Sequence, residues 1–276
     1  ESILDSHEKE IGSYAQGRDR AIDELTFTLF NRIAAIKVME AKDLFPPVIT
    51  KSEEHGNRSF GHKIWLEENP AMRSEEFEGI RDYVISVFDN LGETLPLYNK
   101  QYPYALLPDV VALNDIIEKF NNVERDSDID NNIWANDDIL GWLYENYNND
   151  KKKKFDDSNE KTEYDKVSLQ SQFYTPRWVV EFLVNNSLGK LYMEMYPDSK
   201  IGNEYKIANL DDGIKKEAKP ITEFKTIDPA CGSGNFLLYT FDLLYALYQD
   251  QIDNYGANIN ETDIPKLIIE NNIYGV

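Results

Sequence analysis

The stretch KTIDPACGSGNFLL, from Lys225 to Leu238, limits the possible folds more than any other part of the sequence. The residues before Asp228 are typical of a short strand, and those from Asn235 to about Gln249 are typical of a helix. Between them, Pro229 and two glycines allow turns and close approaches that a Cβ would block. A strand, a glycine loop and a helix in this order open a parallel α/β unit.

The remaining C-terminal pattern completes one such unit. It predicts a helix from Pro176 to about Leu191, a strand at Phe224–Ile227, a short helix near Pro265–Glu270 and a strand at Ile273–Val276. Two strands are too few for a doubly wound sheet. We therefore expect only the first part of an α/β domain.

The N-terminal half is predicted to be helical. Between Asp19 and Ala41 an apolar residue recurs every three or four positions, which predicts an amphipathic helix that Phe45–Pro47 ends. The same periodicity predicts helices at Glu75–Leu91, Ala112–Phe120 and Asp137–Tyr147. A structural role in the core is sufficient to explain these apolar stripes.

A charged stretch separates the two halves. Residues 148–170 are dense in charge and poor in apolar side chains, which is typical of a linker or mobile loop. Its run Lys151–Lys154 could contact phosphate or simply be solvated. The prediction is a helical N-terminal domain (1–147), a charged linker (148–170) and the start of an α/β domain (171–276), an α + α/β chain.

The charge balance argues against the N-terminal half as a phosphate binder. The net charge of the 276 residues is −21; residues 1–150 carry −16 (30 acidic, 14 basic) and residues 151–276 carry −5 (20 acidic, 15 basic). Because nonspecific DNA affinity comes from Lys and Arg that neutralise phosphates, an acidic surface opposes it. Any double-stranded DNA partner is expected to bind mainly elsewhere.

Several classes of protein are disfavoured. The single Cys231 excludes an intramolecular disulfide, and with three His residues it leaves no expected zinc cluster, so no metal site is predicted. No apolar run reaches the roughly 18 residues of a membrane span, and the N-terminus lacks a secretion signal. The expectation is a cytoplasmic protein without a membrane partner.

The glycine loop alone leaves two explanations open. It is neither a G-x-x-x-x-G-K-[ST] phosphate loop nor a complete dinucleotide fingerprint, since Leu237 stands where the third glycine would fall. Its glycines fit either helix packing or a ligand lying against bare backbone at a helix N-terminus.

The whole phrase DPACGSGNFL is more specific. It resembles motif I of the amino-methyltransferases, the S-adenosylmethionine loop of adenine-specific DNA methyltransferases, and IYGV resembles the strand that follows it. The resemblance implies a Rossmann-like methyltransferase domain in which an acid, here Asp228, lies near the amino group of the cofactor. Cys231 is then a small loop residue, because methylating an exocyclic amine needs no covalent enzyme intermediate. The implied cofactor-binding residues are Asp228, Pro229, Ala230, Cys231, Gly232, Ser233, Gly234, Asn235 and Phe236.

A second motif, QFYTPR, precedes the first. Thr175 and Pro176 predict a helix start, with Thr175 as N-cap and Pro176 at the first helical position. Pro176 precedes Asp228 by 52 positions. This order resembles motif X before motif I in the type I, type IIG and phage-defence methyltransferases, where the aromatic-Thr-Pro segment covers the cofactor from the opposite side. The resemblance adds Phe173, Tyr174, Thr175 and Pro176 to the expected S-adenosylmethionine site.

The resemblance extends to the N-terminal half. AIDELTFTLFNRIAAIKVMEA, LLPDVVALNDIIEKF and DDILGWLYENYNNDKK resemble the helical region of the BREX phage-defence adenine methyltransferases, the PglX-like group. These families hold the target adenine with a [DNS]-P-P-[YFW] motif, which the chain lacks; Phe45–Val48 reads FPPV. The expectation is an N-terminal fragment of an adenine-N6 DNA methyltransferase, inactive alone, with no catalytic residue assigned.

Alternative functions predict different ligands. A binding or regulatory module would use the acidic half to recruit a phage-defence protein. A nucleotide-dependent oxidoreductase would bind nicotinamide or flavin at the glycine loop. An RNA or protein methyltransferase would share the same cofactor, because motif I does not name the acceptor.

Overall fold

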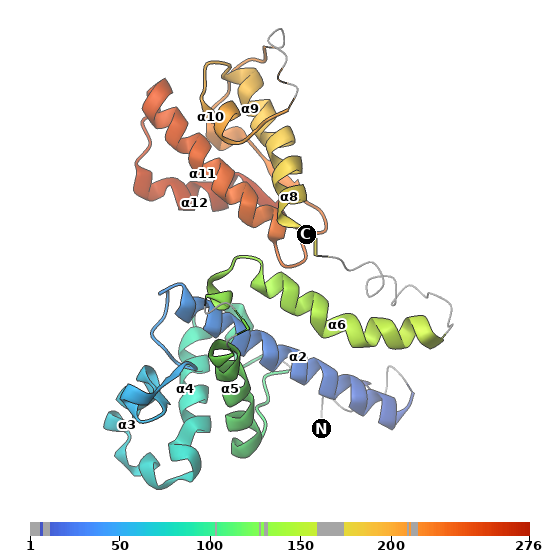
Figure 1. Cartoon of the computed structure of the whole chain (residues 1–276), viewed down its shortest axis with the longest axis vertical. Coiled ribbons are helices and arrows are strands. Elements are labelled where there is room, and N and C mark those ends of the chain that lie inside the picture. Colours follow the sequence, from blue (N-terminus) through green and yellow to red (C-terminus); the bar gives the residue numbers. More distant parts are fainter. Residues whose placement is uncertain are drawn as a thin grey trace. The chain divides into compact units, whose positions relative to one another are not determined.

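The computed structural model describes residues 6–7, 12–102, 104–126, 128–129, 132–158, 174–208, 210 and 215–276. These residues form two compact units, Glu1–Ile139 (unit 1) and Leu140–Val276 (unit 2). Each unit is described separately, with its α-helices labelled in Figure 1.

Unit 1 is helical, as predicted. Its α4 and α5 lie side by side (Figure 1), and its core includes fully buried Ile33, Val84 and Leu113. Its one described sheet is the antiparallel ribbon of β1 and β2, with Lys51 opposite Ser59. The elements are α2 (Tyr14–Ala41), β1 (Lys51–Ser52), η1 (Glu53–His55), β2 (Arg58–Ser59), α3 (Phe60–Glu68), η2 (Pro70–Ser74), η3 (Glu76–Gly79), α4 (Ile80–Leu91), η4 (Pro96–Tyr98), α5 (Val110–Arg125) and η5 (Ile133–Ala135).

The helix predicted from Glu75 begins only at Ile80. Phe77, Glu78 and Gly79 have φ values of 48°, 54° and 66°, in the left-handed region that ends regular helix. The Glu78 carboxylate accepts a hydrogen bond from Arg58 Nε at 2.5 Å. Helical periodicity does not reveal such a contact, because the two residues are distant in the sequence.

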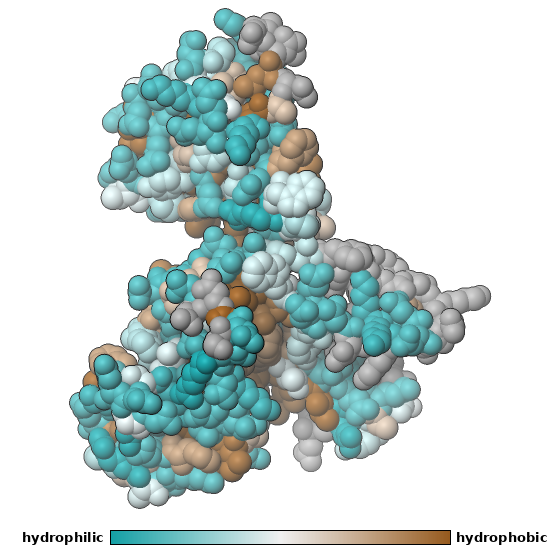
Figure 2. Space-filling model, in the orientation of Figure 1, coloured by the Kyte–Doolittle hydropathy of each residue, from teal (hydrophilic) through white to brown (hydrophobic). Residues whose placement is uncertain are grey.

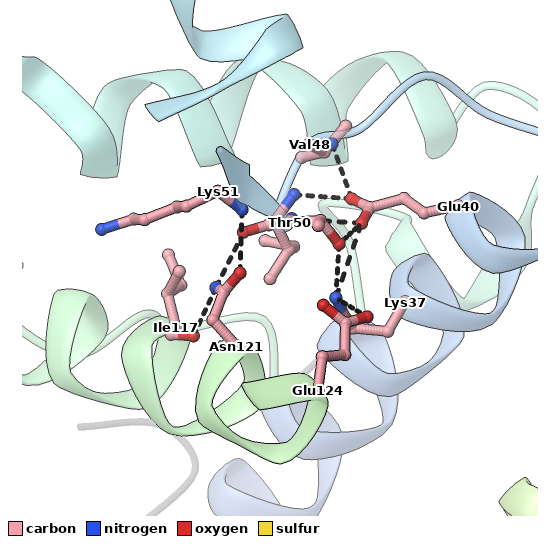
Figure 3. Close-up of polar contacts among 9 residues, drawn as sticks. Lys37, Glu40, Val48, Thr50, Lys51, Ile117, Asn121 and Glu124 are labelled. Carbon is pink, nitrogen blue, oxygen red and sulfur yellow. Dashed lines mark hydrogen bonds and ion pairs between the residues drawn. The ribbon is translucent and has the colours of Figure 1, made fainter. Parts of the chain in front are cut away.

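A buried polar network joins α2, the segment before β1, and α5 (Figure 3). The Glu40 carboxylate accepts hydrogen bonds from the backbone N–H groups of Val48 (2.6 Å) and Thr50 (3.1 Å). Lys37 Nζ, on a fully buried side chain, donates to Glu124 Oε1 at 2.7 Å. The Asn121 amide donates to the carbonyl of Ile117 at 2.8 Å. The network adds polar contacts to an irregular segment whose Val48 and Ile49 are themselves buried.

Unit 2 contains the predicted strand–loop–helix–strand unit. Strands β3 and β4 pair in parallel, with Ile227 opposite Tyr274. Helices α11 and α12 lie between the two strands in the sequence. Helix α11 packs against α8, which lies beside it in Figure 1, and its Leu243 and Leu247 are fully buried. The elements are α6 (Ile139–Ser158), α8 (Arg177–Val184), a π-helical turn η6 (Asn185–Gly189), α9 (Lys190–Met195), α10 (Ile201–Glu204), η7 (Ile221–Glu223), β3 (Thr226–Asp228), α11 (Asn235–Tyr255), η8 (Glu261–Asp263), α12 (Ile264–Asn271) and β4 (Ile273–Gly275).

Helix α6 corrects the beginning of the predicted linker. Residues 148–158 continue the helix rather than forming a loop, and Phe155 in this stretch is buried. The Asn148 side chain donates to the Tyr144 carbonyl at 3.3 Å, so it supports the helical turn before it. Lysine is also a good helix former, which a reading based on charge density overlooks. Residues 159–170 of the predicted linker lie outside the described residues.

A buried hydroxyl–carboxylate pair stabilises unit 2 far from the glycine loop. Asp250 accepts hydrogen bonds from Tyr192 Oη at 2.6 Å and from Ser199 Oγ at 2.8 Å. Gln251 Nε2 donates to the same Tyr192 oxygen at 2.7 Å. Burial, followed by the bond to Asp250, raises the pKa of Tyr192, which keeps the phenol protonated as a donor.

Tyr192→Phe is expected to destabilise unit 2 by about 2 kcal/mol, because the change removes a hydrogen bond to a buried carboxylate. Urea unfolding measures the loss. Tyr196→Phe is the control, since Tyr196 Oη donates to a backbone carbonyl, that of Lys219, at 3.1 Å and not to a carboxylate. Equal losses in the two variants would show that the carboxylate adds nothing.

On the face shown in Figure 2, the surface is mostly hydrophilic, with apolar side chains scattered over it. Within the described part of the chain, no helix combines the length and apolar character needed to cross a membrane.

Candidate functional site

A cavity of about 220 Å³ lies in unit 2, beside the loop that follows β3. Two stretches distant in sequence form it together with α6. Its walls are Gly141, Tyr144, Glu145, Tyr174, Thr175, Ala230, Cys231, Gly232, Ser233, Asn235 and Phe236. The QFYTPR and DPACGSGN motifs therefore meet at one site.

The glycine loop is shaped by its own backbone. The Asp228 carboxylate accepts from the Ala230 N–H at 3.1 Å, and the Gly234 N–H donates to the Cys231 carbonyl at 2.7 Å. Gly232 and Gly234 have φ values of 51° and 86°, which side chains rarely adopt. No described atom lies within 4 Å of a Cβ placed at either glycine, so both border open space.

The end of β4 holds the loop in position. The Val276 N–H donates to the Asp228 carbonyl at 3.0 Å, and the Cys231 N–H donates to the Val276 carbonyl at 3.2 Å. A Cβ at Gly275 would lie 2.8 Å from Leu237 Cδ1 and 3.1 Å from Cys231 Sγ. A side chain at position 275 would therefore displace the Leu237 side chain and crowd that of Cys231.

Side chains from both sides attach the QFYTPR segment to α11: Arg177 pairs with Asp242 at 3.5 Å and lies over the Tyr239 ring, and Asn235 reaches back from the start of the helix. Asn235 Nδ2 donates to the Thr175 carbonyl at 2.8 Å. The prediction of Thr175 as N-cap is wrong: Pro176 occupies the cap position, and α8 begins at Arg177. The Pro176 carbonyl accepts from the Val179 N–H at 2.9 Å, so the chain turns one residue later than predicted.

Asn235 also carries an unused acceptor. Its side chain is buried, at 7% exposure, and its Oδ1 has no hydrogen-bond partner among the described residues. A buried polar atom without a partner is costly. Since Asn235 lines the cavity, a hydrogen-bond donor on a ligand would relieve this cost.

The predicted site residues divide into three groups. Those that line the cavity are Tyr174, Thr175, Ala230, Cys231, Gly232, Ser233, Asn235 and Phe236. Pro176, Asp228, Pro229 and Gly234 are adjacent in the chain but do not line it. Phe173 lies outside the described residues.

Sequence reasoning missed the wall that α6 contributes. Gly141, Tyr144 and Glu145 line the cavity, and no motif indicated them. The available signal was a glycine within the helical pattern of DDILGWLYENY, since such a glycine costs helix stability and often has a packing reason.

The charge of the cavity restricts its ligands. Glu145 is the one acidic side chain among its described walls, and neither Lys nor Arg lines it. Phosphate-rich cofactors usually gain from basic groups, whereas a ligand with positive charge is favoured by a carboxylate. The volume is below the roughly 300–1,000 Å³ of typical small-molecule sites, so these walls enclose only part of a large ligand.

Two curated relatives match nearly the whole chain. Adenine-specific methyltransferase BrxX of Escherichia coli O9:H4 (strain HS) is 28% identical in a 295-residue alignment that covers 95% of this chain and 23% of that protein. Adenine-specific methyltransferase PglX of Lacticaseibacillus casei (strain Zhang) is 26% identical in a 315-residue alignment that covers 92% of this chain and 24% of that protein. No family model matches the chain. The chain thus spans less than a quarter of the length of these relatives, and over that span it is similar to the PglX/BrxX-like group of adenine-specific methyltransferases.

Proposed function

We propose that this chain supplies the cofactor-binding part of an S-adenosylmethionine-dependent, adenine-N6-specific DNA methyltransferase of the phage-defence type. The observation that carries the proposal is the cavity in which QFYTPR and DPACGSGN meet, tied together by Asn235 and Thr175. The similarity to proteins named adenine-specific methyltransferases supports it. The parallel β3–α11–β4 unit supports a Rossmann-like catalytic domain.

The residues present fit the cofactor in chemical character. S-adenosylmethionine carries hydrogen-bond donors and a net positive charge, and the cavity offers the Asn235 acceptor and one carboxylate. Ala230–Ser233 would hold the methionine part against backbone, while Tyr174 and Thr175 would cover it. Asp228 shapes the loop through its bond to the Ala230 N–H rather than by lining the cavity.

When bound, S-adenosylmethionine supplies the methyl group that the adenine amino nitrogen attacks in line, giving N6-methyladenine and S-adenosylhomocysteine. The residues of this chain contribute by binding and orienting the donor, which accelerates a transfer by positioning. The chain has no [DNS]-P-P-[YFW] tetrapeptide. We therefore assign the grip on the flipped adenine, and most contacts with double-stranded DNA, to parts of the protein outside these 276 residues. Protein partners in defence and a cytoplasmic location belong to the same proposal.

Titration calorimetry of the chain with S-adenosylmethionine and S-adenosylhomocysteine tests the cofactor. Saturable binding of both is expected, because both carry the methionine and adenosine parts that the walls would contact. Nicotinamide and flavin dinucleotides are expected not to bind. Binding of those dinucleotides instead would favour the oxidoreductase alternative.

A transfer assay tests the fragment proposal separately. With labelled S-adenosylmethionine and unmodified DNA, no incorporation above background is expected from the chain alone. Turnover by this chain would contradict the assignment of the adenine site to other residues, and it would leave the cofactor assignment intact.

A further inference from the structure

Helix α6 touches the QFYTPR segment at a position where only glycine fits. Gly141 is buried, and a Cβ built on it would overlap the Tyr174 ring. Gly141 is the third residue of α6, and the missing Cβ at this position makes room for the close approach of the ring. One turn later, Tyr144 and Glu145 line the same cavity.

Glu145 differs from the other half-buried or buried acids that the structure describes in unit 2, Glu181, Glu194, Asp228 and Asp250, which all have a bonding partner. Glu145 is half-buried, it lines the cavity, and no hydrogen bond or ion pair of its carboxylate is found within the described ranges. By contrast, Glu181 pairs with Arg177 at 3.4 Å and Glu194 with Lys216 at 2.6 Å. An unpaired carboxylate in a partly desolvated cavity attracts a cation more strongly than one in bulk water.

We propose that α6 is a third wall of the S-adenosylmethionine site, in which Gly141 seats the Tyr174 ring and Glu145 favours the charged methyl donor over its neutral product. The assignment rests on the proposed function and deepens it. S-adenosylmethionine carries one more positive charge, its sulfonium, than S-adenosylhomocysteine. A sulfonium placed inside this cavity of about 220 Å³ would lie within electrostatic range of Glu145.

The packing of the Tyr174 ring against Gly141 is tested by a double-mutant cycle on the ligand-free chain. Gly141→Ala is expected to lower the Tm by about 5 °C, since the new methyl collides with the ring. In the Tyr174→Ala background the same change is expected to leave the Tm unchanged or raise it, because only the helix preference of alanine remains. A Tm that rises in both backgrounds would show that the Tyr174 ring does not need a glycine at position 141.

The charge is tested by calorimetry of Glu145→Gln with both ligands. The affinity for S-adenosylmethionine is expected to fall about tenfold, and the affinity for S-adenosylhomocysteine by less than threefold. The difference should shrink at 1 M salt, where charges are screened within about 3 Å. Asp157→Asn, an exposed acid of α6 away from the cavity, is the matched control and should change neither affinity.

The outcomes separate the two levels of the proposal. If the parent chain binds both ligands and Glu145→Gln weakens them equally or not at all, the charge assignment is wrong while the proposed function stands. If the parent chain binds neither ligand, the proposed cofactor site is wrong and the role of Glu145 falls with it. The double-mutant cycle needs no ligand, so it tests the packing of Tyr174 against Gly141 in either case.

Discussion

Glu40→Gln is expected to destabilise unit 1 by about 3–5 kcal/mol, because it removes one partner from a buried charged network. The carboxylate, only 4% exposed, accepts from Val48, Ile49 and Thr50, and Lys37 Nζ lies 3.9 Å away (Figure 3). A glutamine offers one acceptor oxygen in place of two. Its amino group would face donors, and Lys37 would keep a buried charge with less compensation.

Urea unfolding with hydrogen exchange measures this loss and assigns it to unit 1. Reduced protection is expected in α2 and around residues 48–51, with unit 2 unaffected. Glu124→Gln is the first control: its side chain is 26% exposed, so water can replace its bond to Lys37 and a smaller loss is expected. Glu54→Gln, at an exposed position, should cost nothing measurable. A loss below 1 kcal/mol for Glu40→Gln would show that water enters the network.

Periodicity predicted most helices because burial repeats along a helix. Between Asp19 and Ala41 the apolar stripe located α2, whose Ile33 and Ile36 are fully buried. The same reasoning could not find the network at Lys37 and Glu40. In the sequence this pair is an ordinary (i, i+3) pair of charges, and its burial depends on Val48–Thr50 folding back over α2. Nor could it place the left-handed turn at Phe77–Gly79.

In the candidate site too, some residues could be predicted from the sequence and others could not. The loop residues Ala230–Ser233 were predictable because their chemistry is local: small residues after a strand make room for a ligand. Gly141 and Glu145 were not, because their place depends on α6 meeting Tyr174, which lies 33 positions after Gly141 in the sequence (174 − 141). The predicted domain boundary also separates them: residues 1–147 are assigned to the N-terminal domain, whereas the structure places Leu140–Val276 in one compact unit.

Asn235→Ala is expected to weaken S-adenosylmethionine binding about a hundredfold, roughly 2.7 kcal/mol, because one side chain performs two tasks. Its Nδ2 holds the Thr175 carbonyl, and its Oδ1 is the buried acceptor left for the ligand. Without the amide, the Thr175 carbonyl loses its bond to the start of α11, although Arg177 keeps its contacts with that helix, and the ligand loses a partner. Calorimetry measures the change in Kd.

Asn235→Asp separates the two roles of Asn235. Asn254→Ala controls for the loss of an amide hydrogen bond elsewhere in α11. Asn235→Asp keeps an acceptor for the ligand but removes the donor to Thr175, so a loss equal to that of alanine assigns the effect to the tie. A much smaller loss assigns it to the ligand contact. Asn254→Ala, near the other end of α11, removes a similar amide bond, to Asp250 at 2.8 Å, away from the cavity and should leave Kd unchanged. Unchanged binding in Asn235→Ala would mean that neither atom meets the cofactor, and the site would have to lie elsewhere along the glycine loop.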